Sequence, residues 1–388
     1  MPKDPEVNLA EYTFEGPSQE ALTDLQSLSE EDKKELLMAG VDVTGKDRSG
    51  SFLHMNHSPL YCKTDKPGVE ILDYKKAKEK YDDFDQYDWK LVDPDQDEFT
   101  RKVYENTHGG YVVRTQPGAK IKEPVQSCLF IKGQKVGQNV HNIVIVEEDS
   151  ELHIITGCSV SSETKEGVHL GISEFYVKKG GKLTFTMIHN WGENVTVRPR
   201  TKGIVEEGGQ FLSNYVLLKP VKNLQSYPTI NLAGKGAVGR FNSIIVAPKG
   251  SYINSGSRLL LNAPDTRGEI IARTITTGGT IINPGHIAGH AVPAKGHLEC
   301  KGLILGDGVI HAVPELEGTI EGCELSHEAA VGKIAQEEIE YLMARGLDED
   351  EATSTIVRGF LSVDIMGLPK ELNDLIEKTI AETEADMF

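Results

Sequence analysis

The sequence has few cysteines, and none of them is spaced as a structural site would require. The five cysteines are odd in number and scattered over 388 residues, and no two form a C-x-x-C pair. This spacing argues against a structural zinc site, a ferredoxin-type cluster site and a thioredoxin motif. Unpaired cysteines are typical of a reducing compartment, so we predict a cytoplasmic protein.

Long apolar runs and positive charge are also scarce. No stretch approaches the ~20 apolar residues of a membrane span, and residues 1–6 lack the apolar segment of a secretory signal. We therefore expect no membrane association. The 41 basic residues stand against 59 acidic ones, a formal net charge of −18. Such a field repels nucleic acid, so we expect no nucleic-acid partner.

A phosphate-binding loop is missing as well. The only comparable stretch, residues 331–334 (Val-Gly-Lys-Ile), lacks both the first glycine and the hydroxyl residue of G-x-x-x-x-G-K-[ST]. The chain is therefore not expected to bind ATP in the Walker manner. Any ATP-driven step would need a separate subunit.

The segments that are present divide the chain into three parts. Residues 1–106 are polar and read as mostly helical or irregular, with helices expected at 33–39, 74–81 and 95–104. Residues 107–325 hold 30 of the 39 glycines, which separate short β-rich runs such as 142–146, 183–188 and 243–246. Without a helix-length periodic segment, this part predicts an all-β core, either a sandwich, a barrel or a solenoid.

The remaining residues, 326–388, return to a helical pattern. Apolar residues recur at helical spacing in 335–345, which ends at Gly346, and a second helix is capped by Asp348. A third is expected from Pro369 to Ile380. The apolar residues of these C-terminal helices, Ile356 and Phe360 of the second helix among them, suit either packing against the β core or docking of a partner.

Several motifs resemble those of the SufB/SufD family of iron–sulfur cluster assembly proteins. The most specific is H-E-A-A-V-G-K-I followed by Y-L-M-A-R-G-L, and weaker ones are Thr-Gly-Cys-Ser and Ile-His-Asn-Trp upstream. They occupy residues 327–334, 341–347, 156–159 and 188–191.

This resemblance implies a right-handed parallel β-helix flanked by helical segments. It also implies a non-catalytic scaffold that builds a labile iron–sulfur cluster and passes it to apo-proteins. A SufC-type ABC ATPase subunit would be its partner, together with a sulfur donor. The type of cluster is not implied.

The resemblance also assigns site residues. The functional cysteine of the B-type proteins corresponds to Cys300, and the family's His-Glu pair to His327 and Glu328. The functional histidine of the D-type proteins corresponds to His297. Cys300, His327 and Glu328 would thus be metal ligands, with His297 as a further cluster or sulfur ligand, since thiolate, imidazole and carboxylate can all coordinate iron.

Two questions stay open at this level. In a regular strand His297 and Cys300 point to opposite faces, because their spacing of three is odd. One site can use both only through a bulge or a second subunit, which favours a homodimer, or a heterodimer with a homologue. Alternatives to the scaffold are a β-helix carbohydrate-active enzyme, which the 6% aromatic content disfavours, and a structural or chaperone-like protein without a cluster.

Overall fold

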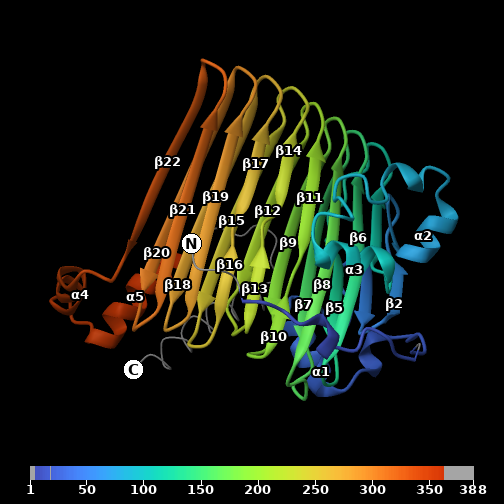
Figure 1. The fold of residues 1–388 in the computed structure, drawn as a ribbon, viewed down its shortest axis with the longest axis horizontal. Coiled ribbons are helices and arrows are strands. Elements are labelled where there is room, and N and C mark those ends of the chain that lie inside the picture. The colour runs from blue at the N-terminus through green and yellow to red at the C-terminus, as the bar shows by residue number, and fades with distance from the viewer. Residues whose placement is uncertain (1–4, 18, 362–388) are drawn as a thin grey trace.

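The computed structural model describes residues 5–17 and 19–361, and the helix expected at 369–380 lies outside them (Figure 1). Short helices precede and follow a long β region. They are η1 (Leu9–Glu11), η2 (Leu25–Ser27), α1 (Glu30–Met38), α2 (Tyr74–Lys80), η3 (Phe84–Gln86), α3 (Glu98–Glu105), α4 (Gln336–Met343) and α5 (Glu349–Leu361).

The strands belong to two sheets. The first sheet has ten strands, in the order β2 (Ser58–Thr64), β1 (Gly50–Met55), β5 (Val125–Ile131), β7 (Glu151–Val160), β9 (Lys182–Asn190), β12 (Gln210–Leu217), β15 (Val238–Ala247), β18 (Thr266–Thr276), β20 (Ala294–Ile304) and β22 (Cys323–Gly332). The second has twelve: β10 (Val195–Val197), β13 (Asn223–Ser226), β16 (Tyr252–Ser255), β19 (Thr280–Gly289), β17 (Ser257–Leu261), β14 (Thr229–Leu232), β11 (Arg200–Val205), β8 (Gly167–Val177), β6 (Val136–Val146), β4 (Tyr111–Thr115) and β3 (Val69–Asp73), with β21 (Val309–Gly318) on β19.

These sheets form a parallel β-helix. The pairs β1–β2 and β3–β4 at the N-terminal end are antiparallel. From β4 onward each strand pairs in parallel with a strand of an adjacent turn, as β12 does with β15 and β15 with β18. The chain therefore rises from turn to turn as a solenoid (Figure 1). The all-β core with flanking helices is confirmed, and of the three architectures left open by the residue pattern the solenoid is the one that forms.

The interior between the sheets is filled by apolar side chains that stack along the solenoid axis. One such row consists of four phenylalanines in the order Phe185, Phe175, Phe211 and Phe241. The ring centroids of neighbours in this row are 4.7–5.7 Å apart. Each buried aromatic of this kind contributes on the order of 2–3 kcal/mol from area removed from water, with further stabilisation from edge-to-face contact.

The N-terminal segment covers the first turns and is partly β. The strands β1, β2 and β3 lie within residues 1–106, where the sequence predicted mostly helical or irregular structure. One buried carboxylate anchors the segment: Glu174 accepts hydrogen bonds from the backbone N–H groups of Trp89, Leu91 and Val92. The tertiary contact, rather than local propensity, sets the path of this loop.

The expected helix signals are present. Ser29 caps α1 by accepting from the Asp32 N–H, and Gly40 ends the turn with φ of 83°. Asp348 and Glu351 form a reciprocal capping box at α5. The C-terminal helical part begins later than residue 326, where the sequence predicted its start. Strand β22 runs through Gly332, and the first helix after it begins at Gln336. Parallel pairing with β20 overrides the helix preference of the Glu-Ala-Ala stretch in this strand.

Candidate metal centre and its relatives

Strand β20 presents two chemically different faces. His297, Glu299 and Lys301 are partly exposed on the outside of the solenoid, whereas Leu298 and Cys300 lie in the interior core. The alternation follows from the period of two along a strand. His297 and Cys300 therefore point to opposite faces, as their spacing predicted, and no bulge intervenes in the β18–β20 or β20–β22 pairing.

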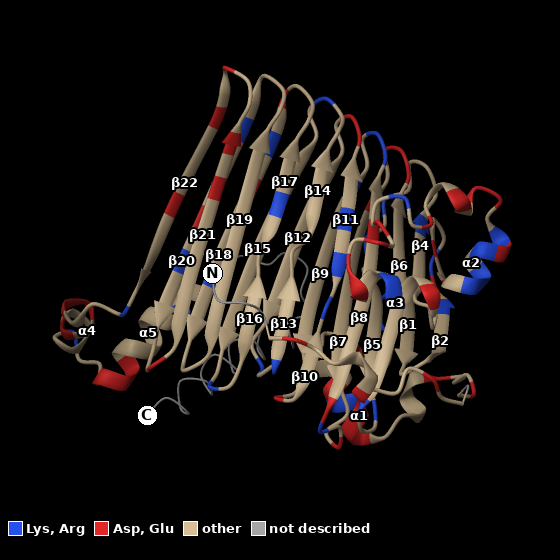
Figure 2. Cartoon of the chain, viewed as in Figure 1, with Lys and Arg blue, Asp and Glu red and all other residues tan. Residues whose placement is uncertain are grey.

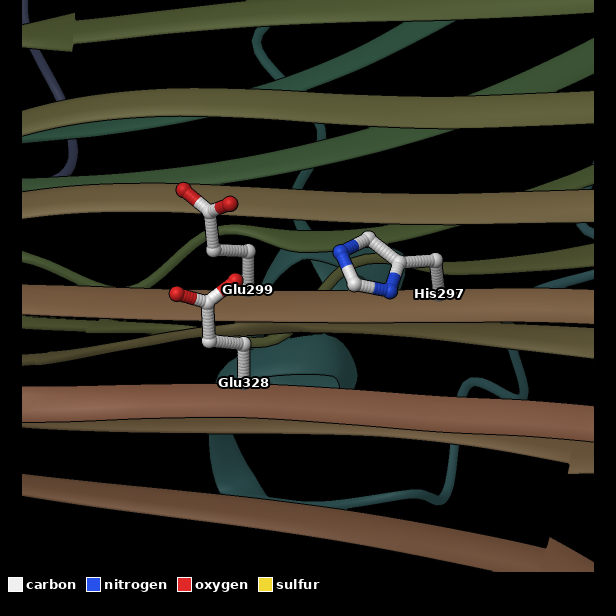
Figure 3. A group of neighbouring side chains, drawn as sticks. All are labelled: His297, Glu299 and Glu328. Carbon is white, nitrogen blue, oxygen red and sulfur yellow. The ribbon is translucent and has the colours of Figure 1, made fainter.

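The neighbouring strand completes a group of ligands on the outer face. The register sets Glu328 of β22 beside Glu299 of β20, so both carboxylates project from the same side. His297 turns its ring toward them, and one ligand atom from each of the three residues lies within 4.8 Å of the others (Figure 3). Imidazole nitrogen and carboxylate oxygen are suitable donors for a divalent transition metal.

Two basic side chains pair with the carboxylates of this group. Arg273 forms an ion pair with Glu299, and Lys301 Nζ lies 3.3 Å from Glu299 Oε1 and 3.4 Å from Glu328 Oε1. Partial burial by itself would raise the pKa of Glu299, but Arg273 and then Lys301 outweigh it and leave the pKa below its ordinary value. Glu299 is therefore an ionised acceptor at neutral pH.

Figure 2 shows this mixture of charges over the last strands of the solenoid. His297 is itself oriented by the Ser326 hydroxyl, which lies 3.0 Å from its Nδ1 atom. The Nε2 atom is then the one left for a ligand. Glu299 is the residue that sequence reasoning missed. Its place two residues after His297, on the same face of a strand, is the signal that could have found it.

Cys300 lies beneath this outer group, in the core of the last turns. Its side chain is buried, with 2% of the residue exposed. Burial raises the pKa of the thiol to about 11. The negative charge of Glu299 adds to this increase, and the positive charge of Arg273 opposes it. Cys300 is thus a neutral thiol in this state, and a bound metal would have to displace its proton.

His327 belongs to the inner side as well. It pairs with Leu298, so the register directs it to the face that also carries Cys300, while Glu328 faces outward. His327 is nevertheless exposed, because β22 is the last strand of its sheet among the described residues. The structure therefore separates the four predicted residues into an outer pair, His297 and Glu328, and an inner pair, Cys300 and His327.

In the part of the chain that the structure describes, the last turn of the solenoid carries exposed apolar side chains. Among the described residues β22 pairs only with β20, and β21 only with β19. Val309, Ile320 and Val331 of this turn are 42–44% exposed. Unpaired strand edges with exposed apolar side chains are suited to pairing with another chain.

The C-terminal helices give the two predicted docking residues different surroundings. Phe360 packs against an apolar stripe on the outer face of the ten-stranded sheet, together with Val357 and Leu361 of the same helix. Ile356 instead lines an open groove between α4 and α5. The other residues of this groove are Glu337, Glu338, Tyr341 and Leu342.

The remaining cysteines have the surroundings of packing residues. Cys128 and Cys158 are fully buried, and Cys62 and Cys323 are partly buried and donate to backbone carbonyl oxygens. Burial raises the pKa of Cys128, Cys158 and Cys62, to about 12 in the case of Cys62. None of these four is grouped with the outer ligands.

Comparison with known proteins gives one consistent family. The family model described as "SUF system FeS cluster assembly, SufBD core domain" matches residues 129–360. An iron–sulfur cluster assembly SufBD family protein of Archaeoglobus fulgidus is 51% identical over 358 residues, covering 92% of this chain and 96% of the relative. The chain belongs to the SufBD family.

Relatives from other organisms are similar over shorter or longer parts of their length. A SufBD family protein of Methanothermobacter thermautotrophicus is 44% identical over 92% of this chain and 89% of its own length. The iron–sulfur cluster assembly protein SufB of Bacillus subtilis is 30% identical over 78% of this chain and 66% of its own length. Within the described residues, no helix is both long and apolar enough to cross a membrane.

Proposed function

We propose that this SufBD-family chain is a cytoplasmic, non-catalytic scaffold on which a labile iron–sulfur cluster is assembled and from which it is passed to apo-proteins. The observation that carries the proposal is the convergence of His297, Glu299 and Glu328 on the outer face of β20 and β22, with Cys300 on the inner face of the same strand pair. Iron and sulfide are the cargo of this site.

The arrangement suggests an order of events. The outer imidazole and carboxylates are partly exposed and can take up ferrous iron first, once Arg273 and Lys301 release the carboxylates. The Cys300 thiol joins only when the last turn moves, because it is buried and protonated in the present state. A site with few thiolates and several weaker donors suits a cluster that has to be released again.

A second chain would complete this site. Edge strands β21 and β22 could pair with those of another copy across a two-fold axis, bringing two Cys300 and two His327 near the same axis. The separate ABC-type ATPase would dock on the groove between α4 and α5, where Ile356 is accessible, and its cycle would supply the motion of the last turn.

Anaerobic reconstitution with ferrous iron and sulfide tests the function. A scaffold develops a thiolate-to-iron absorption band that is lost in Cys300→Ser and retained in Cys62→Ser and Cys128→Ser. A β-helix carbohydrate-active enzyme or a structural protein would show no such band. A Cys300→Ser protein that still reconstitutes a full cluster would disprove the assignment of the thiol.

A further inference from the structure

A cluster of two histidines and a glutamate lies on the outer face of the other sheet. His286 on β19 and His290 just after it stand on either side of Glu317 of β21, because the register places Glu317 beside Ala288, midway between the two histidines. Glu317 Oε2 lies 3.3 Å from His286 Nε2, and Glu317 Oε1 lies 3.5 Å from His290 Nε2. One carboxylate thus faces two imidazole nitrogens.

The orientation of His290 is set by a row of amides. Asn262 donates its side-chain N–H to Asn231 Oδ1 at 2.8 Å, which leaves Asn262 Oδ1 facing His290 Nδ1 at 2.7 Å. This network assigns the Nδ1–H tautomer to neutral His290. Its Nε2 lone pair is then directed at the Glu317 carboxylate, a repulsive arrangement unless a proton or a metal ion lies between them.

His286 has a similar relation to the same carboxylate. Its side chain is only 12% exposed, and burial, together with the charge of Arg258, lowers the pKa of His286 in spite of Glu315 and Glu317. A mostly neutral imidazole at pH 7 is a competent ligand.

We propose that His286, Glu317 and His290 form a binding site for a first-row divalent transition metal such as Zn²⁺ or Fe²⁺. Two imidazoles and a carboxylate with open positions are a donor set that such ions favour, and Asn262 acts as the outer partner that orients a ligating histidine. Glu317 and His290 are partly exposed, and coordination at ~2.1 Å would require their side chains to move toward His286.

This site is independent of the proposed scaffold site. The two groups lie on the outer faces of different sheets, β19–β21 for the one and β20–β22 for the other. The chain could therefore bind a metal here whether or not it assembles a cluster through Cys300.

Zinc titration of the untagged, chelator-treated full chain tests the proposal. To silence the other group, the titration uses a His297→Ala/Glu328→Gln background, in which one equivalent should still bind. Adding His286→Ala or Glu317→Gln should weaken binding at least roughly ten-fold, and Asn262→Ala by roughly ten- to hundred-fold, the range typical of lost outer partners. His311→Ala, an exposed histidine of β21 outside the group, is the matched control.

Cobalt(II) provides the second readout, since its absorption bands report coordination directly. The bands should appear in the background variant and disappear with His286→Ala, while far-ultraviolet circular dichroism shows that the β-helix is intact. Zinc affinity that is unchanged by His286→Ala, or the absence of any saturable site in the His297→Ala/Glu328→Gln background, would overturn the proposal.

Discussion

At the scale of single residues, the period of the strand separates the proposed functions of neighbouring side chains. His297 and Glu299 face the solvent side of β20, and Cys300 faces the core. The first consequence is that iron uptake and cluster formation should be separable by mutation. In the proposed scaffold the outer residues would supply nitrogen and oxygen donors, whereas the inner thiol would supply the sulfur ligand of a stable cluster.

We expect His297→Ala and Glu299→Gln to weaken ferrous iron binding to the cluster-free protein roughly ten-fold or more, because each removes one of few donors. Cys300→Ser should leave ferrous binding within about two-fold of the parent and abolish the absorption band of the reconstituted cluster. Anaerobic equilibrium dialysis with ferrous iron, followed by reconstitution, measures both. Loss of ferrous binding in Cys300→Ser would show that the thiol already binds in the first step.

A further residue-scale prediction concerns Glu299 and pH. Its folded-state pKa lies below the ordinary value, with Arg273 and Lys301 as the lowering groups. A carboxyl group whose pKa is lower in the folded state stabilises the fold. This contribution is fully present above the unfolded-state pKa near ~4.3 and is lost as the pH falls through the folded-state pKa.

The stability difference between the parent and Glu299→Gln should therefore be constant from pH 7 to about 5 and shrink as the pH is lowered further. Urea denaturation at a series of pH values measures it. Glu324→Gln, which removes an exposed carboxylate paired with Lys295, is the control, and its effect should be small throughout. A difference that grows toward low pH would contradict the ionised state of Glu299.

At the scale of elements, the C-terminal helices combine a packed face and an open face. Phe360, Val357 and Leu361 cover an apolar stripe of the ten-stranded sheet. Ile356 turns toward the groove shared with Tyr341 of α4. A helix of this kind can be anchored to the solenoid by one face and remain available to a partner on the other.

Phe360→Asp should destabilise the chain by about 2 kcal/mol or more, because it places a charge against an apolar surface. Ile356→Asp should change stability by less than about 1 kcal/mol and weaken binding of the ATPase subunit. Chemical denaturation and co-purification with the ATPase distinguish the two effects. Normal co-purification of a folded Ile356→Asp protein would place the docking surface elsewhere.

At the scale of the whole molecule, the last turn of the solenoid suggests an assembly. Strand β22 is exposed along most of its length and pairs on one side only within the described residues. Val309, Ile320 and Val331 add exposed apolar surface. Pairing of two copies at this end would satisfy the strand edges. It would also bring the scaffold site of one copy close to that of the other.

We expect the purified chain to form a homodimer, and Ala330→Pro on β22 to convert it to a monomer, since proline removes a backbone donor and is disfavoured inside a paired strand. Light scattering measures the molar mass, and circular dichroism confirms that the β-helix persists. A parent chain that is monomeric alone and dimerises only on addition of a homologous second chain would replace the homodimer by a heterodimer.

The sequence by itself determined the all-β core, the flanking helices and the placement of several caps. Glycine-punctuated β-rich runs and signals such as Ser29 and Asp348 act locally, through backbone conformation and short-range hydrogen bonds, and therefore survive without knowledge of the fold. The opposite faces of His297 and Cys300 also followed from strand periodicity alone. The family resemblance added the solenoid form of the core.

Only the tertiary structure decided which residues meet. Glu299 joined the candidate site because the register of β20 and β22 sets it beside Glu328, and His286 met Glu317 because β19 pairs with β21. The path of the loop at Trp89 depends on the buried carboxylate of Glu174. These contacts join residues far apart in the chain, and their register is set by the summed packing of all turns, which no local pattern contains.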